Sequence, residues 1–315
     1  MNQLSSLTVA IPAFNESAVL PELARQLCAV LDRLPGVDAR VLLVDDGSTD
    51  GSRSIIERLV EKDARFEAVF LSRNFGHQAA LTAALDHATG DATIVMDADL
   101  QDDPELIPEL VARYEEGYDV VYAVRRHRQE PLAFRFAYWT FYRLLRRMSR
   151  VSIPTDAGDF GLMSRRVVEA VRATPERQRY LRGLRAWVGF KQTGSEVDRP
   201  ARAADKSKYG TLKLVQLAMD GVFAFSLVPL RLATLLGALA IAVALVWALV
   251  VVVAKLAMDR SPQGFSAVII TIVFMSGANL FFLGVIGEYV GRTYEESKGR
   301  PQYLVDRILR HGHRQ

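Results

Sequence analysis

The sequence predicts an α/β protein in which a doubly wound, mostly parallel sheet is followed by amphipathic helices and a two-helix transmembrane hairpin. Short apolar segments alternate with segments of helical spacing through residues 7–124. Acidic residues directly follow several of the apolar segments, as they do at the carboxyl ends of strands in open α/β sheets. Two long stretches, 232–254 and 261–287, contain no charged residue. Each exceeds the roughly 20 residues that cross a bilayer core.

The first half of the chain supplies the expected strands and helices of the sheet. Strands are expected at 7–11, 39–44, 66–71, 92–96 and 119–124. Helices are expected at 18–34, 54–62, 76–88 and 104–116. The first helix carries leucines three or four residues apart and stops at Pro35-Gly36. The strands are short and continuously apolar, which is typical of a sheet covered on both faces.

The second half of the chain is organised around a membrane. Residues 125–150 are rich in arginine and aromatic side chains, a composition that can bind nucleic acid. Next to two membrane spans, we instead predict a basic interface helix at about 130–150 and no nucleic-acid partner. Loops are expected at 152–160 and 199–210. The domains are then a catalytic domain at 1–210, an amphipathic juxtamembrane helix at 211–230, two transmembrane helices at 231–291 and a basic tail at 292–315.

The distribution of Lys and Arg predicts the orientation in the membrane. Basic residues are frequent before the first span and after the second, whereas the connecting turn, 255–262, carries only Lys255 and Arg260. Because basic loops stay on the cytoplasmic side, the catalytic domain and both termini are expected to be cytoplasmic. No signal peptide is expected at the N-terminus. The single cysteine, Cys28, excludes an internal disulfide framework.

Polar motifs follow three of the expected strands and should meet at one edge of the sheet. They are Pro12-Ala13-Phe14-Asn15-Glu16, Asp45-Asp46-Gly47-Ser48 and Asp97-Ala98-Asp99. No Gly-x-Gly-x-x-Gly follows the first strand, and no Gly-Lys-Ser/Thr loop is present, so a Rossmann oxidoreductase and a P-loop nucleotidase are excluded. Without a phosphate loop, a hard divalent cation must hold a diphosphate, and Asp97 and Asp99 supply oxygen ligands for it.

These motifs, taken with three others, resemble those of a known enzyme family. The others are Ser72-Arg73-Asn74-Phe75-Gly76-His77-Gln78, Gly158-Asp159-Phe160 and Ser207-Lys208-Tyr209. Together with the two-span tail, they resemble the family 2 inverting glycosyltransferases of the A-type fold. Within that family, the sequence is similar to the polyprenyl-phosphate (bactoprenol) glycosyltransferases, a group like dolichol-phosphate-mannose synthase. The resemblance covers nearly the whole chain.

The resemblance implies a role for each matching residue. Mg²⁺ or Mn²⁺ would be held by Asp97, Asp99 and Gln101. The nucleotide sugar would be bound by Pro12, Phe14, Glu16, Asp46 and Asp97, and by a closing loop that contains Arg202, Ser207 and Lys208. The catalytic residues would be Asp159, Asp99, Arg125 and Arg135, of which the two arginines would grip the lipid phosphate. Asp159 is expected to act either as a base or as an orienting residue.

Several of the neighbouring residues have structural alternatives. Phe14 can be plain core packing, and Asp45 can simply hold the turn that follows it. His77 can be a ligand or a surface polar group. Asp102 and Asp103 are expected to favour the N-terminus of the next helix instead of binding metal. Two departures from the family pattern also occur: the closing loop lacks its usual glycine and reads Ala204-Asp205-Lys206-Ser207-Lys208, and Asp103 replaces a proline.

The expected activity is therefore metal-dependent, inverting transfer of a sugar, with UDP-glucose as the first choice of donor, to undecaprenyl phosphate. The same acceptor with a UDP-amino-arabinose, UDP-N-acetylhexosamine or GDP-mannose donor stays open. An alternative from another class is a non-enzymatic subunit that binds or translocates glycolipid. A processive polysaccharide synthase does not fit, because the sequence lacks a Gln-x-x-Arg-Trp motif. The resemblance also implies a bacterial inner-membrane protein that forms a homo-oligomer, a tetramer in its relatives.

Overall fold

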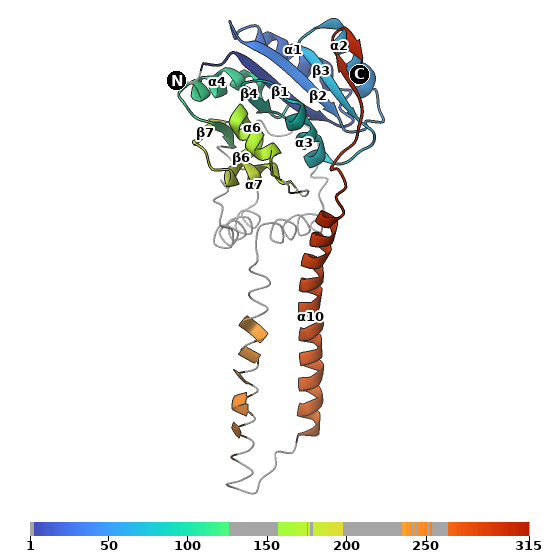
Figure 1. Cartoon of the computed structure of the whole chain (residues 1–315), viewed down its shortest axis with the longest axis vertical. Helices are drawn as coiled ribbons and strands as arrows, with labels where there is room; N and C mark the ends of the chain where they lie inside the picture. Colours follow the sequence, from blue (N-terminus) through green and yellow to red (C-terminus); the bar gives the residue numbers. More distant parts are fainter. Residues whose placement is uncertain are drawn as a thin grey trace. The chain divides into compact units, whose positions relative to one another are not determined.

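The computed structural model describes residues 3–125, 157–174, 176, 179–197 and 264–314, together with separate helical residues between 235 and 253. The chain divides into two units. The first contains residues 1–142, 151–208 and 300–315, and the second contains residues 143–150 and 209–299. Figure 1 follows the elements of both units along the chain.

The first unit is an α/β domain built on one mixed sheet. Its strands are β1 (Ser6–Ala13), β2 (Asp38–Asp45), β3 (Phe66–Leu71), β4 (Ala92–Val95), β5 (Val120–Arg125), β6 (Ala157–Ser164), β7 (Gln192–Val197), β8 (Val305–Arg310) and β9 (His313–Arg314). Within the described residues, the strand order is β7-β5-β6-β4-β1-β2-β3-β8-β9. Strands β4, β1, β2 and β3 are parallel, whereas β6 runs antiparallel to β4 and β5, and β8 runs antiparallel to β3.

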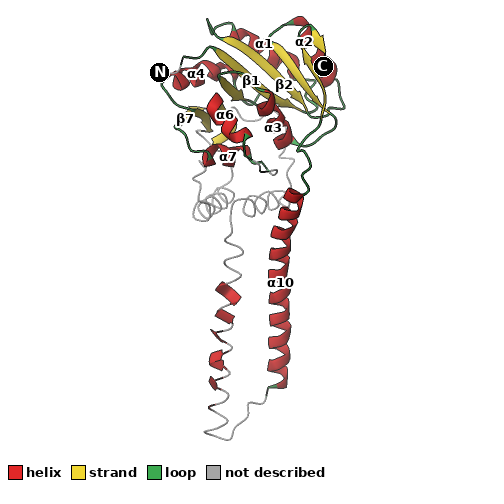
Figure 2. Cartoon of the chain, in the orientation of Figure 1, coloured by secondary structure: helices red, strands yellow, loops and turns green. Residues whose placement is uncertain are grey.

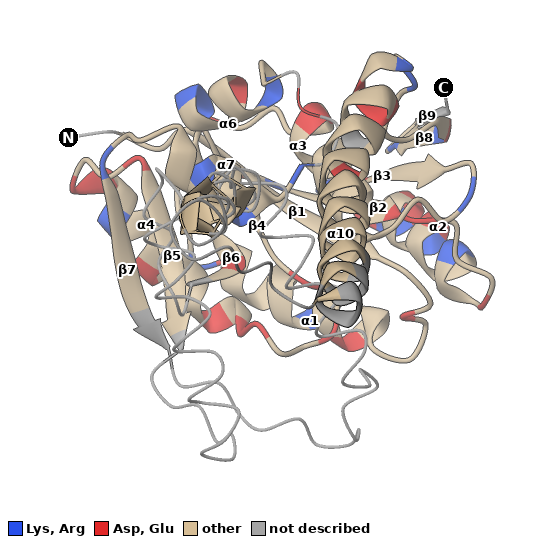
Figure 3. Ribbon diagram, turned by 90° about the horizontal axis from the view of Figure 1, so that it is seen from below, with Lys and Arg blue, Asp and Glu red and all other residues tan. Residues whose placement is uncertain are grey.

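Helices cover both faces of this sheet, as the continuously apolar strands predict. They are α1 (Leu20–Leu31), α2 (Ser52–Lys62), α3 (His77–His87), η1 (Pro104–Leu106), α4 (Ile107–Glu115), α6 (Arg165–Arg172) and α7 (Leu181–Trp187). Helices α1, α2 and α4 pack with Val9 and Ile11 of β1 on one face. Alternate residues such as Ala10 and Leu42 face α3 on the other side, where α3 also packs with α6 and α7. Figure 2 shows these elements by secondary structure, and Figure 3 shows the strands between α3 and α6 on one side and α1 on the other.

The elements predicted for residues 7–124 are confirmed, with ends that move by one to three residues. The expected helix 104–116 begins with a turn of 3-10 helix, η1, before α4. The expected strand 92–96 ends one residue earlier, at Val95. The spacing of apolar residues was sufficient to predict these elements because each of them buries one of its own faces.

The expected loop at 152–160 is wrong over its last four residues, because β6 begins at Ala157. The segment was expected to be a loop because the spacing of apolar residues fades there. Gly161 is required by close strand packing: a Cβ atom there would lie 2.6 Å from the carbonyl oxygen of Val121 in β5. The sheet is therefore mixed on this side of β4, where the sequence predicted continued parallel winding.

The segment expected as a basic tail, 292–315, contains regular structure for which no element was expected. Helix α10 (Phe265–Ser297) continues past residue 292, and residues 305–310 form β8, which lies between β3 and β9. Leu304 accepts a hydrogen bond from the backbone of Ser72 (2.9 Å). The end of the chain therefore belongs to the same compact unit as the first strands. The charged pattern Val-Asp-Arg-Ile-Leu-Arg does not alternate as a half-buried strand should, so β8 could not be predicted from its own residues.

The second unit is described mainly by α10, whose charged residues, Glu288, Arg292, Glu295 and Glu296, all lie toward its C-terminal end. By length and composition, Phe274–Ser297 is the one stretch of the described residues that could cross a membrane. Only separate helical residues of the expected first span are described, and the two-span hairpin is not confirmed. The expected interface helix at about 130–150, loop 199–210 and helix 211–230 lie outside the described residues altogether.

Candidate active site

The acidic motif after β4 forms a tight turn at the carboxyl ends of the parallel strands. The carboxylate of Asp99 accepts a hydrogen bond from the backbone N–H of Gln101 (3.1 Å). Asp102 accepts one from the backbone N–H of Asp97 (3.2 Å) and is buried. Leu100, between them, has a φ of 57°, a left-handed conformation that is unfavourable for leucine. Such local strain concentrates at functional turns.

Asp97 carries a carboxylate oxygen that is poised for a ligand. Its Oδ1 atom is buried and has no hydrogen-bond partner among the described residues. The pKa of Asp97 is raised to about 6, mainly by burial and also by the carboxylates of Asp102, Asp159 and Asp99, against the opposing effect of His77. A buried oxygen without a hydrogen-bond partner costs folding free energy, and a bound cation would remove that cost.

His77, the first residue of α3, lies between two carboxylates of the site. Its Nε2 atom is 3.7 Å from Asp97 Oδ1 and 4.0 Å from Asp159 Oδ2. Gly76 precedes it with a φ of 97°, a conformation that favours glycine and that turns the chain into α3. The structure therefore brings together the motifs that follow β3 and β4 with the one in β6. The ligand role that was left open for His77 agrees with this position but is not tested by it.

Asp159 in β6 is held by an arginine that the sequence reasoning missed. Arg182 of α7 donates from Nε and Nη2 to the two carboxylate oxygens, each at 2.8 Å. Burial raises the pKa of Asp159, but the hydrogen bonds and charge of Arg182 outweigh burial, and the net pKa lies below its usual value. A carboxylate with such a partner holds a proton poorly. Its geometry suits an orienting or electrostatic group better than a general base.

Arg185 is a second cation of α7 that the sequence reasoning missed. It is 3% exposed, its guanidinium donates to the carbonyl of Gly158 (3.2 Å) and it lies over the ring of Tyr122, 5.0 Å from the centroid. Burial lowers its pKa to about 10. Arg182 and Arg185 are three residues apart, a spacing that places both on one helical face. That spacing was the available signal in the sequence.

The segment after β1 presents an aromatic ring and a carboxylate. Phe14 is 43% exposed, which excludes core packing as its role. Pro12 lies in β1 and pairs with Val44 of β2. Burial raises the pKa of Glu16, as do the nearby carboxylates of Asp99, Asp50 and Asp97. Glu16 therefore belongs to the same negatively charged region as the motif after β4.

The two aspartates after β2 have different partners. Asp45 is fully buried and accepts hydrogen bonds from the backbone N–H of Ser48 (3.3 Å) and from Arg53 Nε (2.8 Å), so it holds the turn. Asp46 accepts hydrogen bonds from the backbone N–H groups of Phe75 (2.8 Å) and Gly76 (2.9 Å). Burial raises the pKa of Asp46, although these hydrogen bonds oppose the effect. Its expected contact with a nucleoside is not tested.

The residues present fit a divalent cation. Among the described residues, no three His, Cys, Asp or Glu side chains are already arranged as a metal site. Mg²⁺ does not need one, because it is usually held by one or two carboxylates together with substrate phosphates. The unpartnered Oδ1 of Asp97 is the observation that agrees with such a site. Asp103, in contrast, caps η1 by accepting from the backbone N–H of Glu105 (2.9 Å), as expected.

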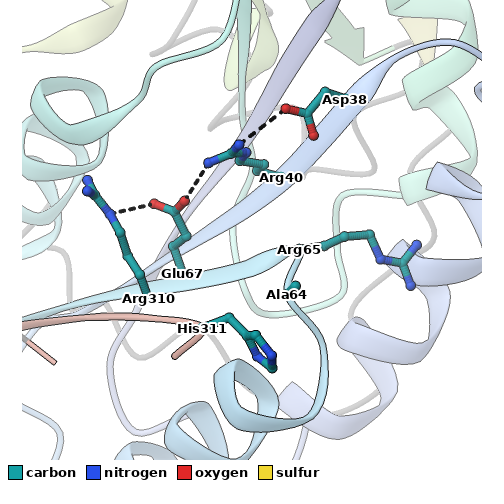
Figure 4. Close-up of a pocket in the computed structure, with 7 residues that line it drawn as sticks. All are labelled: Asp38, Arg40, Ala64, Arg65, Glu67, Arg310 and His311. Carbon is teal, nitrogen blue, oxygen red and sulfur yellow. Dashed lines mark hydrogen bonds and ion pairs between the residues drawn. The ribbon is translucent and has the colours of Figure 1, made fainter. Parts of the chain in front are cut away.

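A cavity of about 510 Å³ lies at a different place, where β2 and β3 begin. Figure 4 shows its charged side chains, with Glu67 between Arg40 and Arg310. The distances from Glu67 are 3.0 Å to Arg40 and 3.3 Å to Arg310. Because these charges neutralise one another and lie at the amino ends of the strands, this cavity is not the candidate active site.

Some of the expected site residues cannot be placed. Arg125 is the last residue of β5, and its side chain is not described. The remaining expected contacts lie outside the described residues: Arg135, Arg202, Ser207 and Lys208. The described part of the site therefore consists of the strand-end motifs, His77, Asp159 and the two arginines of α7.

Comparison with known proteins finds relatives that match nearly the whole chain. An uncharacterized glycosyltransferase of Synechocystis is 42% identical over 95% of this chain and 94% of its own length. A bactoprenol glucosyl transferase of Shigella phage SfX is 36% identical over 95% of this chain and 98% of its own length. Among solved structures, a Mycobacterium tuberculosis glucosyl-3-phosphoglycerate synthase in complex with Mn²⁺ and UDP-glucose is 18% identical over 70% of this chain and 77% of that chain, with a TM-score of 0.46. The model of glycosyl transferase family 2 matches residues 8–172. The chain thus belongs to glycosyl transferase family 2 and is a glycosyltransferase, similar over nearly its whole length to bactoprenol glucosyl transferases.

Proposed function

We propose that this enzyme transfers a sugar, glucose from UDP-glucose in the first instance, to undecaprenyl phosphate at the cytoplasmic face of the membrane, with inversion at the anomeric carbon. The observation that carries the proposal is the turn Asp97–Asp102. It holds a buried, unpartnered carboxylate oxygen beside His77 and the Asp159–Arg182 pair. The near full-length similarity to a protein named bactoprenol glucosyl transferase supports the lipid acceptor.

The chemistry needs little help from a general base. The acceptor is a phosphate monoester with a second pKa near 6, so most of it is a dianion at neutral pH. An acceptor oxygen attacks the anomeric carbon while the bond from that carbon to the nucleoside diphosphate breaks. No proton has to leave the nucleophile. Asp159, held ionised by Arg182, therefore orients the reacting groups and does not remove a proton.

The main energetic task is to bring two anions together and to stabilise the departing diphosphate. Asp97, Asp99 and the amide of Gln101 would hold Mg²⁺ or Mn²⁺, which neutralises charge on the diphosphate when bound. Exposed Phe14 offers a face on which the base can stack, and Glu16 and Asp46 offer acceptors for the nucleoside. The arginines expected to bind the lipid phosphate, Arg125 and Arg135, would provide bidentate contacts.

The membrane-associated half of the chain would deliver the acceptor. An apolar helix, Phe274–Ser297, is long enough to cross a bilayer, and an uncharged segment at 232–254 precedes it. A basic, aromatic helix at about 130–150 would hold the catalytic domain against anionic headgroups. The polyprenyl phosphate would then present its charged end at the interface, within reach of the strand-end motifs.

A reconstitution assay tests the proposal. The full-length protein in detergent is incubated with undecaprenyl phosphate and labelled UDP-glucose, in Mg²⁺, in Mn²⁺ and in EDTA. We expect a labelled lipid in either metal and none in EDTA, with a β-linked phosphate sugar by NMR. Parallel reactions with UDP-N-acetylhexosamine, a UDP-amino-arabinose and GDP-mannose identify the donor.

A matched pair of variants sharpens the assay. Asp99→Asn should lower kcat by at least about 100-fold, because it weakens binding of the metal ion that would stabilise the departing diphosphate. Asp103→Asn, four residues away, should retain activity, since Asn also caps helices well. Full activity of Asp99→Asn would refute the metal assignment. The absence of labelled lipid with every donor would refute the acceptor, and transport of a sugar-lipid across vesicles without synthesis would favour a translocating role.

A further inference from the structure

We propose that Arg53, braced by strand β8, is a positioning residue for the loops that follow β2 and β3, of which the first carries Asp46, an expected contact of the nucleotide part of the donor. This inference rests on the proposed function for the identity of the ligand. The positions of the loops do not depend on it. Arg53 lies in the first turn of α2 and has no expected contact with substrate. It touches β2, β3 and β8, so that β8, near the end of the chain, is linked to a loop of the site.

The first link runs from Arg53 to the loop after β2. Arg53 Nε donates to Asp45 Oδ2 at 2.8 Å, and Asp45 is fully buried. Asp45 in turn accepts from the backbone N–H of Ser48. The hydroxyl of Ser48 accepts from the backbone N–H of Asn15 at 3.0 Å. Arg53 is therefore two side chains away from the segment that carries Phe14 and Glu16.

The same guanidinium also holds the end of β3. Arg53 Nη2 donates to the carbonyl of Leu71 at 2.9 Å. Leu71 is paired with Val305 of β8, and Asp306 of β8 lies 4.0 Å from Arg53 Nη1. The buried ring of Phe70 lies between α2 and β8 in this contact, with the guanidinium of Arg53 at 5.5 Å and that of Arg307 at 4.5 Å from its centroid.

The second link runs from the C-terminal segment to the loop after β3. Leu304 accepts from the backbone N–H of Ser72 at 2.9 Å. The hydroxyl of Tyr303 bonds Asp86 Oδ2 of α3 at 2.9 Å. The first contact holds the start of the segment 72–76, and the second holds the end of α3, the helix that follows this segment. The last two N–H groups of the segment donate to Asp46, so the C-terminal segment contacts the chain on both sides of the group that holds this carboxylate.

The two loops also pack directly against each other. Gly47 has a φ of 70°, and a Cβ atom there would lie 2.4 Å from the carbonyl carbon of Arg73 and 2.5 Å from the backbone nitrogen of Asn74. A displacement of one loop must therefore move the other. Arg53 lies at the point where both loops, β3 and β8 converge, so its removal should loosen the donor site as a unit.

The test uses full-length variants and two readouts. Arg53→Gln removes the guanidinium, Arg53→Lys keeps the charge but loses the two-sided contact, and Asp306→Asn removes the brace from β8. Arg310→Gln is the matched control, because it removes an ion pair with Glu67 from the other end of the same strand. Hydrogen exchange reports on the amides of Asn15, Ser48 and residues 72–76. Steady-state kinetics report KM for donor and acceptor separately.

We expect Arg53→Gln to raise the donor KM about tenfold with the acceptor KM unchanged, and to speed exchange in those loops more than in the central strands. Arg53→Lys should recover part of both effects, and Asp306→Asn should show a weaker form of them. Should Arg53→Gln fail to fold because Asp45 is left buried without its partner, Arg53→Lys and Asp306→Asn decide the question.

The proposal is overturned if exchange rises evenly over the whole sheet, if Arg310→Gln has the same effect on the loops, or if donor and acceptor KM rise together. These outcomes differ from failure of the proposed function. A wild-type protein that makes no sugar-lipid from any donor would refute the acceptor or donor. The exchange pattern of the variants would still support or refute the positioning of the loops by Arg53.

Discussion

At the scale of single residues, the buried carboxylate of Asp97 lowers the stability of the folded protein when no ligand is bound. Its pKa is raised to about 6 from an ordinary value of 3.8. Because the folded pKa exceeds the unfolded one, the ionised side chain destabilises the folded protein above that pH, and protonation relieves the cost as the pH falls. A bound divalent cation would remove the cost in a different way.

Asp97→Asn should therefore raise the unfolding midpoint in EDTA while abolishing transfer. The side chain is 34% exposed, so the gain is discounted for solvent screening to about 1 kcal/mol at neutral pH. Thermal unfolding in detergent checks this, and the gain should shrink as the pH falls from about 6 to about 4, the folded and unfolded pKa values of Asp97. Addition of Mn²⁺ should stabilise the wild type more than the variant. A variant less stable than the wild type at neutral pH in EDTA would contradict this account.

The Asp159–Arg182 pair gives a second prediction for a single residue. Arg182 keeps the pKa of Asp159 below its ordinary value against the effect of burial. In Arg182→Gln, burial acts without that opposition, so the pKa of Asp159 should rise and ionisation should require a higher pH. The acid limb of the pH profile of kcat/KM should move upward. In the double variant Asp159→Asn, Arg182→Gln, the acid limb should not move upward. An unchanged acid limb in Arg182→Gln alone would contradict the role of an ionised Asp159.

At the scale of elements, the site depends on how closely two loops and two strands approach. Gly47→Ala should destabilise the fold by about 3 kcal/mol, because its Cβ atom would meet backbone atoms that cannot move aside. Gly36→Ala is the matched control: its φ of 81° is equally unfavourable, but nothing lies within 4 Å of its Cβ atom. The control should lose only about 1 kcal/mol. Chemical denaturation compares the two, and equal losses would show that loop packing is unimportant.

Strands β6 and β8 show where local pattern stops being informative. Each of the parallel strands β1 to β4 buries both faces, so its apolar run is visible in the sequence. Strand β6 lies where the apolar spacing fades, and its Gly161 is explained only by the close backbone of β5. Strand β8 is charged, and its partner β3 is more than 200 residues earlier in the chain. Pairing with so distant a strand produces no periodic pattern in the residues of β8 that could predict it.

At the scale of the whole molecule, the proposed hairpin makes the chain cross the membrane twice. A cysteine placed at Ser261, in a Cys28→Ser background, should react with a membrane-impermeant maleimide from outside intact spheroplasts. A cysteine at Gln315 should react only after permeabilisation, because the catalytic domain and both termini are expected to be cytoplasmic. Labelling of both positions, or of neither, in intact spheroplasts would contradict the two-span topology.

The sequence by itself determined the enzyme class of this protein and the first half of its fold. Strand-end motifs, the missing phosphate loop and the uncharged segments are local features, which can be recognised without knowing how the chain folds. Only the tertiary structure decided which groups meet. It placed His77 between Asp97 and Asp159, gave Asp159 its partner in α7 and joined Arg53 to β8. These contacts join residues distant in sequence, and their geometry follows from packing and not from any local pattern.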